Sequence, residues 1–475
     1  MDFDFDIVLE INEIKEKEID ELAIFDGSTG MKRTFTDHYN STRGIAGSLK
    51  YDMGVDENSC VCLFAPNHVD YMPVTLAVGL CGAKITPVNP LYKANELLNV
   101  LDGSRSTTSD CFQCQTNTHH IVHFPSGTTG KPKGVAISHA NLTWVSRMDY
   151  FLRCPFFHIY GMVVSAMYSS WIGNPIYTMS GRFDFELMLE MITKYQPKNA
   201  HLVPPIILGL AKSPLVDKYD MSSLELIISA AAPLGAETEI AVRDRLQCTV
   251  KQAWGMSELS PIGTITPSEK IKPGSVGLVV SNTYGKILDK DGNSLGPNQQ
   301  GELAIKGPQV MMGYQDEPQQ TKDCLSSSGW LLTGDMFYYD EDGYFFMTDR
   351  IKELIKTRGF QVAPAELEEL ILGHDDVNDV AVIQIPDEAS GELPRAYIVL
   401  KAEEKEEGST DHDDDKEQEE KLKKCIYEWV KERVAPYKRL DGGIVFVDSI
   451  PKSASGKILR RILRDELAEQ MKVAK

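Results

Sequence analysis

The sequence lacks the basic surplus and the cysteine pattern that mark nucleic-acid-binding and disulfide-rich proteins. Its 475 residues hold 49 Lys and Arg against 69 Asp and Glu, which gives a formal net charge of −20. An acidic surface repels nucleic acid and acidic membranes, so we expect neither as a partner. Nine cysteines form an odd count in a long chain. That count argues against a disulfide framework and favours a reducing compartment.

Recognisable targeting segments are also lacking. The first residues, MDFDFDIVLE, do not have the basic start and apolar stretch of a signal peptide, and the last residues, MKVAK, do not form an SKL-type address. One charge-free run, Cys154 to Gly181, is long enough to span a bilayer, but Pro155, Gly161, Gly173 and Pro175 interrupt it. We interpret the run as buried core and expect a cytoplasmic protein without a transmembrane segment.

Negative charge is concentrated in one stretch. Residues 403–420 read EEKEEGSTDHDDDKEQEE and hold 11 acids and 2 lysines, so they supply −9 of the net charge. Such a run repels itself and has little to bury, which predicts a disordered surface insertion. An interaction tail is the alternative.

Apolar runs and turn residues predict an α/β fold. Val61–Pro66 and Lys84–Val88 are typical of buried strands, and Val69–Cys81 is typical of the helix between them. This βαβ rhythm indicates mostly parallel sheets flanked by helices. From Gly274 to Gly313 the strands become short and alternating, which favours a small β-barrel-like unit.

A second pattern marks the end of the large domain. Asp340 to Gly343 is a hairpin-turn signal, and a new α+β pattern begins after Asp349-Arg350. We therefore expect a multidomain protein, with a large N-terminal domain over residues 1–349 and a small α+β C-terminal domain over residues 350–475.

A glycine-rich loop, Phe124 to Val135, reads FPSGTTGKPKGV. Its glycines let the backbone approach a ligand closely, and its hydroxyl groups and two lysines suit a polyphosphate. The loop is not a Walker A motif, because Pro132 follows Gly130-Lys131 where that motif requires Ser or Thr. A polar turn without a ligand is the alternative.

Further segments follow this loop in a fixed order. They read PFFHIYG from Pro155, AAAPLG from Ala230, WGMSE from Trp254, GWLLTGD from Gly329, DRIKELIK from Asp349 and PKSASGK from Pro451. Together with the loop they resemble the adenylate-forming superfamily of acyl-CoA synthetases, firefly luciferase and adenylation domains. Val203-Pro204-Pro205 and GFQVAPAE from Gly359 are most similar to the 4-coumarate:CoA ligase branch.

The resemblance implies a reaction in two steps. A carboxylate attacks the α-phosphate of ATP to give an acyl-adenylate and pyrophosphate, and a thiol, usually that of CoA, then displaces AMP. Cations and hydrogen-bond donors must stabilise the phosphoryl charge that develops. The C-terminal domain is expected to be mobile and to rotate between the steps, with Lys352 at its hinge.

The resemblance also assigns roles to residues of the large domain. The residues that would hold the β- and γ-phosphates are Ser126, Gly127, Thr128, Thr129, Gly130 and Lys133. Ser257 would contact the α-phosphate, and Glu258 with Thr128 would hold Mg²⁺ through hard oxygen ligands. Trp254, which stands where the family usually has Tyr, would stack on adenine. The remaining residues of this domain are Ala231, Ala232 and Gly255 in the nucleotide site and His158 as a gate beside the acid pocket.

Other roles fall near and within the C-terminal domain. Asp335 would bind the ribose hydroxyls with help from Arg350. Lys457 would reach the carboxylate and the α-phosphate during adenylation, and Lys356, with Gly359 and Gln361, would belong to the thioester-forming face. Each residue taken alone has a structural alternative, which is a solvated lysine, a turn residue for Asp335, a core histidine for His158 and a helix cap for Glu258.

Two connections are shorter than the resemblance predicts. Leu101 to Phe124 lacks several dozen residues, and Leu142 to Pro155 is also short. In the family these regions supply a strand, a helix and part of the acid-pocket wall, so their loss can expose a sheet edge or a core face. A splice variant, an imperfect gene model and a decayed enzyme are the alternatives.

The first short connection contains a possible metal motif. Cys111, Cys114, His119 and His123 have the spacing C-x₂-C-x₄-H-x₃-H, which resembles a zinc knuckle. An altered connection without metal is the simpler interpretation.

We interpret the chain as an AMP-forming acid–thiol ligase that uses ATP, Mg²⁺ and CoA and takes a small carboxylic acid as its substrate. A 4-coumarate-like aromatic acid and a medium- or long-chain fatty acid are both open. The alternatives are a catalytically impaired family member, a luciferase-like oxygenase and a carrier-loading adenylation domain.

Overall fold

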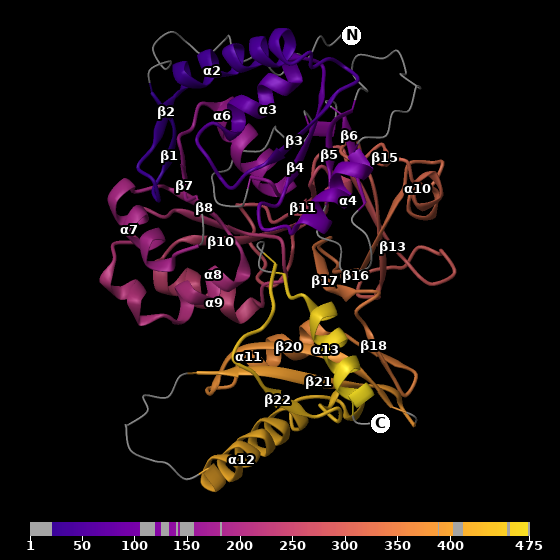
Figure 1. The fold of residues 1–475 in the computed structure, drawn as a ribbon. Coiled ribbons are helices and arrows are strands. Elements are labelled where there is room, and N and C mark those ends of the chain that lie inside the picture. Colours follow the sequence, from indigo (N-terminus) through magenta and orange to yellow (C-terminus); the bar gives the residue numbers. More distant parts are fainter. Residues whose placement is uncertain are drawn as a thin grey trace. The chain divides into compact units, whose positions relative to one another are not determined.

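The structure is a computed structural model that describes residues 21–104, 119–124, 133–138, 141–142, 156–180, 183–387, 389–401, 412–453 and 457–473. The chain forms two compact units, whose elements are labelled in Figure 1. The first holds residues 1–286, 304–333 and 340–346, and the second holds residues 287–303, 334–339 and 347–475. The last division lies close to the predicted boundary at residue 349. The two shorter segments of the second unit fall inside the predicted large domain.

The first unit contains a five-stranded sheet of order β15-β6-β5-β4-β3. The predicted βαβ segment is present as β3 (Cys60–Phe64), α3 (Tyr71–Leu80) and β4 (Lys84–Val88), and α4 (Ala94–Ser104) follows it. β5 (His119–His123) is parallel to β4, while β6 (Val135–Ser138) and β15 (Gly313–Tyr314) are antiparallel to their neighbours. Because β5 pairs directly with β4, the sheet is continuous across the connection that is predicted to be short.

A second sheet in this unit has the order β12-β11-β10-β9-β8. Its parallel strands are β8 (Asn199–Leu202), β9 (Leu226–Ser229) and β10 (Thr249–Gly255), and its antiparallel strands are β11 (Ile262–Ile265) and β12 (Leu278–Val279). The helices that follow or precede these strands are α7 (Phe185–Tyr195), α8 (Pro204–Lys212), η5 (Pro214–Lys218) and α9 (Ala236–Leu246). Apolar residues from α7, α8 and α9 pack with β8, β9 and β10 in one buried cluster, so both the helices and the sheet depend on this core.

The remaining part of the first unit includes the charge-free run. A three-stranded sheet of order β2-β1-β7 is made from β1 (Leu22–Asp26), β2 (Lys32–Thr34) and β7 (Ile176–Thr178), with α2 (Phe35–Gly47) and η2 (Ser48–Asp52) after β2. The charge-free run forms η4 (Tyr160–Met167), α6 (Tyr168–Ile172) and β7. Every residue of η4 is buried, as predicted for core. Within the described ranges no helix is long and apolar enough to cross a membrane.

A four-stranded sheet of order β13-β14-β16-β17 contributes residues to both units. Its strands are β13 (Tyr284–Leu288), β14 (Gly301–Lys306), β16 (Leu331–Tyr339) and β17 (Phe345–Arg350), and α10 (Pro318–Cys324) precedes β16. The predicted hairpin turn joins β16 to β17. There the Asp340 carboxylate accepts hydrogen bonds from the backbone N–H groups of Asp342 and Tyr344, both at 3.0 Å, and Gly343 has a φ of 83°. That positive φ is the conformation for which the turn needs glycine.

The second unit has an antiparallel sheet of order β19-β18-β21-β20, with β22 parallel to β21. Its elements are β18 (Ile355–Thr357), β19 (Phe360–Val362), α11 (Pro364–Leu372), β20 (Val377–Asp387), β21 (Gly391–Leu400), α12 (His412–Lys431), η7 (Pro436–Lys438), β22 (Ile444–Phe446) and α13 (Arg460–Val473). Residues from α11 and α12 pack in a buried cluster with residues from β20 and β21, and α13 contributes to a second cluster. The predicted α/β fold class, with a small α+β C-terminal part, is confirmed.

The prediction of disorder over residues 403–420 is wrong for its second half. Helix α12 begins at His412 and continues to Lys431, whereas residues 402–411 lie outside the described residues. The physical reason is that the place of these residues at the start of a helix matters as well as their acidic composition. Acidic residues in the first turns of a helix are stabilised by its N-terminal partial positive charge, and the later turns bury Ile426 and Val430 in the core.

A buried ion pair holds the start of α13 in the second unit. Arg460 lies 2.7 Å from Oε2 of Glu368 on α11, and both side chains are nearly buried. Oε1 of Glu368 also accepts the backbone N–H of Val382, at 2.7 Å. Burial raises the pKa of the Glu368 carboxyl, while the nearby Arg460 opposes that shift. The pair therefore joins α11, β20 and α13.

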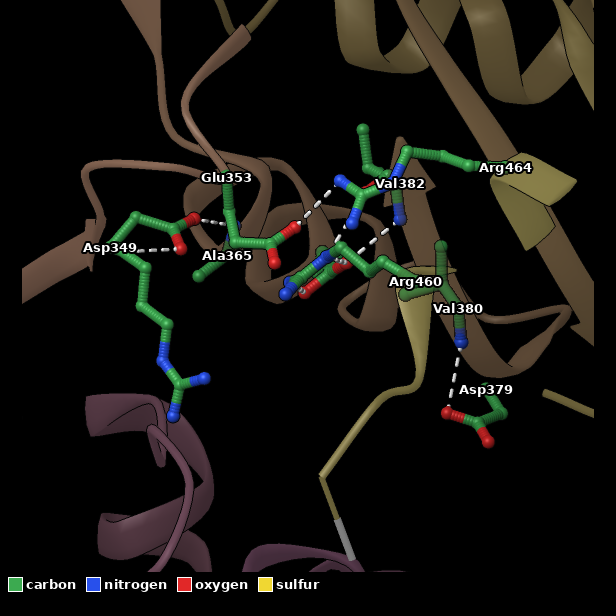
Figure 2. Close-up of polar contacts among 10 residues, drawn as sticks. Asp349, Glu353, Ala365, Asp379, Val380, Val382, Arg460 and Arg464 are labelled. Atoms are coloured by element: carbon green, nitrogen blue, oxygen red, sulfur yellow. Dashed lines mark hydrogen bonds and ion pairs between the residues drawn. The ribbon is translucent and has the colours of Figure 1, made fainter. Parts of the chain in front are cut away.

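The same cluster includes two further acids, Asp349 near the end of β17 and Glu353 just after it (Figure 2). Glu353 lies 3.0 Å from Arg464 of α13. Asp349 accepts the backbone N–H of Arg350 at 2.7 Å and that of Ala365 at 2.9 Å. The Asp349 side chain is buried, and burial raises the pKa of its carboxyl. Three acids from residues 349–368 are thus grouped with two arginines from the first turns of α13.

The buried pair should stabilise the second unit far more than an exposed pair on the same helix. Removing one partner of a buried pair leaves a desolvated charge, so Glu368→Ala should lower the free energy of unfolding by about 3–5 kcal/mol. The matched control is Glu366→Ala, because Glu366 of α11 pairs with Lys438 at 2.7 Å but its side chain is 49% exposed. That change should lower it by about 1 kcal/mol or less. Urea unfolding of the two variants tests this difference, and equal losses would contradict it.

Candidate functional site

The glycine-rich loop connects two adjacent antiparallel strands of the first unit. The loop residues Ser126, Gly127, Thr128, Thr129 and Gly130 lie outside the described residues. The loop begins after β5 and ends before β6, where His123 is paired with Val135. At the end of the loop, a Cβ on Gly134 would lie 2.9 Å from the side chains of Phe124 and Val122, so only glycine fits there without a shift. Close packing therefore fixes the two ends of the loop next to each other.

The predicted Trp254–Glu258 segment forms the end of β10 and the turn η6 (Ser257–Leu259). Trp254, Ser257 and Glu258 are all buried. A Cβ on Gly255 would lie 1.9 Å from the carbonyl oxygen of Pro261, so the close approach of the chain requires glycine. A Cβ on Gly263 would lie 2.5 Å from the Trp254 ring, which shows that the indole lies directly against the β11 backbone.

One tyrosine brings the loop and this turn together. The Tyr314 hydroxyl donates a hydrogen bond to Oε1 of Glu258 at 2.8 Å. The ammonium group of Lys133 lies 4.9 Å from the centre of the Tyr314 ring. Two residues that the sequence predicts for phosphates and metal are therefore joined through a residue that it did not predict.

Backbone hydrogen bonds support the same connection. Gln315 N–H donates to the Gly134 carbonyl at 2.7 Å, and Met312 N–H donates to the Ala136 carbonyl at 3.0 Å. Met311 N–H donates to the Glu258 carbonyl at 2.8 Å. The residues on both sides of strand β15 thus connect the loop exit, strand β6 and the η6 turn through backbone hydrogen bonds.

The residues predicted for adenine include one strained position. Ala231 has a φ of 76°, a conformation that favours glycine. Such a backbone costs on the order of 1–3 kcal/mol and persists only where the surrounding structure holds it. Ala231 and Ala232 are half-buried and lie one residue beyond β9, which ends at Ser229. Strain at the carboxyl end of a parallel strand is consistent with the predicted site.

Histidines and a tyrosine gather near the predicted gate residue. The His158 and His123 rings are 6.0 Å apart, centre to centre, in an edge-to-face arrangement. Two residues after His158, the Tyr160 hydroxyl lies 2.6 Å from Nδ1 of the buried His201. His201 lies on β8, next to a β9 residue that also pairs with Lys251 of β10. The sheet therefore places a buried histidine and a buried lysine on the same face.

His201 is held uncharged. Burial, together with the positive charge of Lys251, lowers the pKa of His201 to about 3. A neutral ring can accept the Tyr160 hydroxyl proton in a hydrogen bond, whereas an imidazolium cannot. The arrangement supplies polar groups inside an otherwise apolar region without adding another positive charge.

Two of the residues predicted for the ribose lie together in the second unit. Arg350 Nε is 3.8 Å from Oδ1 of Asp335. Gly334, which precedes Asp335, donates its N–H to Oε1 of Glu302 at 2.9 Å and accepts the N–H of Ile351 at 3.0 Å. The carboxylate at residue 335 is therefore fixed on β16, beside the end of β17 that carries Arg350. Lys352, the predicted hinge residue, follows directly after this contact.

The residues predicted for the thioester step form a hairpin in the same unit. Lys356 of β18 is paired with Gln361 of β19, and Gly359 in the turn has a φ of 83°. The Lys356 backbone N–H donates to Glu392 at 2.7 Å. Paired residues of an antiparallel ladder point to the same face, so the structure brings Lys356 and Gln361 together as expected.

The predicted adenylation lysine lies on a loop closed by its own hydrogen bonds. Ser453 N–H donates to the Lys457 carbonyl at 2.8 Å, and Lys457 N–H donates to Ser453 Oγ at 3.1 Å. Two ion pairs flank this loop, Lys452 with Asp379 at 2.6 Å and Arg460 with Glu368. Residues 454–456 between them lie outside the described residues. The base of the loop is thus fixed on both sides of Lys457.

The possible zinc motif stays a prediction. Cys111 and Cys114 lie outside the described residues, and the side chain of His119 is not described. His123 is buried beside His158. In the described part of the chain no three His, Cys, Asp or Glu side chains are grouped in a way that could hold a metal ion.

Neutral His201 gives a testable pH dependence. Between pH 6.5 and 3, the unfolded chain binds a proton at this histidine and the folded protein does not, so stability falls as the pH falls. His201→Gln removes this titrating group. The difference in free energy of unfolding between the unchanged protein and the less stable variant should therefore shrink by about 1.4 kcal/mol per pH unit below pH 6. Urea unfolding at pH 7, 6 and 5 measures it, and parallel stability curves would show that the assignment is wrong.

Comparison with known proteins gives matches along nearly the whole chain. The AMP-binding enzyme family matches residues 12–109 and 112–315, and the AMP-binding enzyme C-terminal domain matches residues 366–457. The first match is interrupted inside the connection that is predicted to be short. Tyr314 lies near the end of that match, although no motif used in the sequence analysis contains it.

Named relatives agree with these matches. The probable 4-coumarate--CoA ligase 1 of Dictyostelium discoideum is 39% identical over 361 residues, which cover 73% of this chain. The chain spans only 63% of the length of that relative. The 4-coumarate--CoA ligase 2 of Nicotiana tabacum is 34% identical over 514 residues, which cover 94% of this chain and 91% of the relative. The peroxisomal OPC-8:0-CoA ligase 1 of Arabidopsis thaliana is 35% identical, with 93% and 90% covered.

The aligned length bears on the short connections. The alignment with the tobacco protein has 514 positions, which outnumber the 475 residues of the chain. The tobacco protein therefore carries residues that have no counterpart here, as short connections require.

Solved structures share the fold. The anthranilate CoA ligase AuaEII in complex with anthranoyl-AMP has a TM-score of 0.87 and 22% identity, with 99% of this chain and 98% of that chain covered. A benzoate CoA ligase from Burkholderia xenovorans has a TM-score of 0.83 and 20% identity, with 97% and 100% covered.

Proposed function

Since the chain belongs to the AMP-binding enzyme family, we propose that it is an ATP-dependent acid:CoA ligase. In this proposal it converts a carboxylic acid into acyl-AMP with release of pyrophosphate, and then transfers the acyl group to the thiol of CoA with release of AMP. The observation that carries the proposal is the contact of Lys133 and Glu258 with the same tyrosine, at the exit of the glycine-rich loop.

The first step needs charge stabilisation more than covalent chemistry from the protein. Negative charge develops on phosphate oxygens when the carboxylate attacks and pyrophosphate leaves. Lys133 offers a positive charge at the end of the loop, and the buried Ser257 offers a hydroxyl and a backbone N–H. Lys133 lies over the Tyr314 ring and Ser257 is buried in η6 without any ligand, and groups placed in advance need little rearrangement during the reaction.

The donor set at Glu258 fits a magnesium ion. Magnesium prefers carboxylate, hydroxyl and phosphate oxygens. Oε1 of Glu258 accepts the hydrogen bond from Tyr314. Among the described residues no hydrogen bond or ion pair reaches Oε2. Glu258, with Thr128 of the loop, would hold Mg²⁺, which supplies positive charge to the phosphates when it is bound.

The second unit supplies one set of residues for the adenylation step and another set for the thioester step. Lys457 carries a positive charge on a loop with a fixed base, which suits contact with the carboxylate and the α-phosphate. Lys356 and Gln361 lie on a separate hairpin, so a rotation about the Lys352 region would exchange one face for the other. This exchange is part of the proposal.

The acid itself is proposed only by class. The relatives are named for 4-coumarate and for OPC-8:0, an aromatic and a fatty-type acid. Tyr160 and His201 add polar groups beside the predicted gate residue His158. The proposal includes both a hydroxylated aromatic acid and a fatty acid as substrates. Measuring activity with a panel of such acids distinguishes the two classes.

A catalytically impaired protein is the second candidate. It is favoured by one observation, the shortened chain relative to the tobacco ligase. The parallel pairing of β4 with β5 weighs against it, since the sheet that carries the loop has no missing strand between them.

The proposal predicts acid-dependent ATP–pyrophosphate exchange by the purified protein. Labelled pyrophosphate should enter ATP only when a suitable aromatic or fatty acid and Mg²⁺ are present, because the first step is reversible. A panel of hydroxycinnamates and of medium and long fatty acids measures it. A soluble, cooperatively melting protein that shows no exchange with any acid would favour the impaired candidate.

The two lysines should affect different steps. Lys457→Ala should reduce acyl-AMP formation by about 100-fold or more, a loss typical of one group that stabilises the transition state, and spare thioester formation from supplied acyl-AMP. Lys356→Ala should have the opposite pattern. Pyrophosphate exchange and CoA thioester formation, measured separately, check the prediction. Equal losses in both steps for each variant would refute the division.

A further inference from the structure

Tyr314 occupies an unusual position in the nucleotide site. It is the last residue of the two-residue strand β15, and its hydroxyl reaches across 56 positions in the sequence to Oε1 of Glu258. The face of its ring is occupied by Lys133, 4.9 Å from the centre.

The direction of the hydrogen bond is fixed. An ionised carboxylate has no proton to give and can only accept, so the Tyr314 hydroxyl is the donor in its 2.8 Å contact with Oε1 of Glu258. A phenol can donate only one proton, so Oε1 is held while Oε2 of the same carboxylate stays available for another partner.

The tyrosine itself is held from two sides. Its backbone is paired with Val135 of β6, and its N–H donates to Thr321 Oγ1 of α10 at 2.9 Å. Thr321 Oγ1 in turn donates to the Glu317 carbonyl at 3.0 Å. A Cβ on the preceding Gly313 would lie 2.9 Å from the Thr321 side chain, so the close packing requires glycine. Strand and helix therefore place the ring without any ligand.

We propose that Tyr314 is a positioning residue for nucleotide activation, which orients the Glu258 carboxylate for a metal ion and holds Lys133 over its ring. The proposal rests on the proposed function of the same site. Tyr314 does not touch the reacting atoms. It acts through Glu258 by fixing one carboxylate oxygen and through Lys133 by limiting where the ammonium group can move.

The test is Tyr314→Phe, which keeps the ring and removes only the hydroxyl. The matched control is Tyr344→Phe. Tyr344 is also a buried tyrosine of the first unit, its hydroxyl donates to the Lys270 carbonyl at 2.6 Å, and Lys270 and Lys272 lie 5.7 Å and 5.2 Å from its ring centre. Both variants lose one hydroxyl beside lysine side chains, but only one of them acts on a predicted site group.

Two readouts separate positioning from general stability. In pyrophosphate exchange, Tyr314→Phe should raise the Mg²⁺ concentration for half-maximal rate by about 10-fold or more, because a hydrogen bond to a charged group is lost. The rise in melting temperature caused by ATP with Mg²⁺ should shrink, while the rise caused by AMP without Mg²⁺ should not. Tyr344→Phe should leave both readouts unchanged.

A double variant tests whether the effect passes through Glu258. If it does, Tyr314→Phe added to Glu258→Gln should change the Mg²⁺ dependence by less than twofold, because the carboxylate it orients is already gone. An unchanged Mg²⁺ dependence for Tyr314→Phe, or an equal loss of ATP and AMP binding, would overturn the proposal. A native protein that binds ATP with Mg²⁺ but shows no exchange would instead overturn the ligase function, while the melting readout still decides the role of Tyr314.

Discussion

A charged side chain that is buried away from water needs a hydrogen-bond or ion-pair partner, and each unit contains a buried carboxylate that meets this requirement. Glu258 is buried in the first unit and receives the Tyr314 hydroxyl. Glu368 is buried in the second and receives Arg460 together with a backbone N–H. In each case the partner arrives from a distant part of the sequence, so satisfying the charge also joins elements that local structure would leave apart. The groups that chemistry requires and the contacts that hold the fold are therefore partly the same.

These contacts differ in how many carboxylate oxygens remain available for a further partner. The carboxylate of Glu368 accepts bonds on both oxygens and is closed to a ligand. Glu258 is bonded through one oxygen, which keeps its orientation and still allows a further bond. His201 follows a third pattern, because the low pKa keeps it neutral beside a buried lysine. A carboxylate bonded on both oxygens, a carboxylate bonded on one oxygen and a neutral histidine are thus distinguished by how many hydrogen bonds and ion pairs each makes.

Sequence patterns predicted the elements that depend on local rules. The βαβ segment from Cys60 to Val88 and the hairpin turn at Asp340–Gly343 follow from apolar runs and turn chemistry, and the structure has both. The disorder expected over 403–420 was wrong in part, because composition alone ignores the helix dipole and the apolar face that begins further along. Tyr314 was missed since a strand of two residues has no periodicity, and its role exists only after folding brings it to Glu258. The arginines of α13 were missed for the same reason.

The order in which residues are synthesised gives the α13 arginines a further consequence. Asp349, Glu353 and Glu368 emerge from the ribosome about a hundred residues before Arg460 and Arg464, and meet their cations only afterwards. The second unit therefore cannot complete these ion pairs until the first turns of α13 have been made. A chain that ended before Arg460 would leave the buried Glu353 and Glu368 without these cationic partners, and an unpaired buried charge is strongly destabilising.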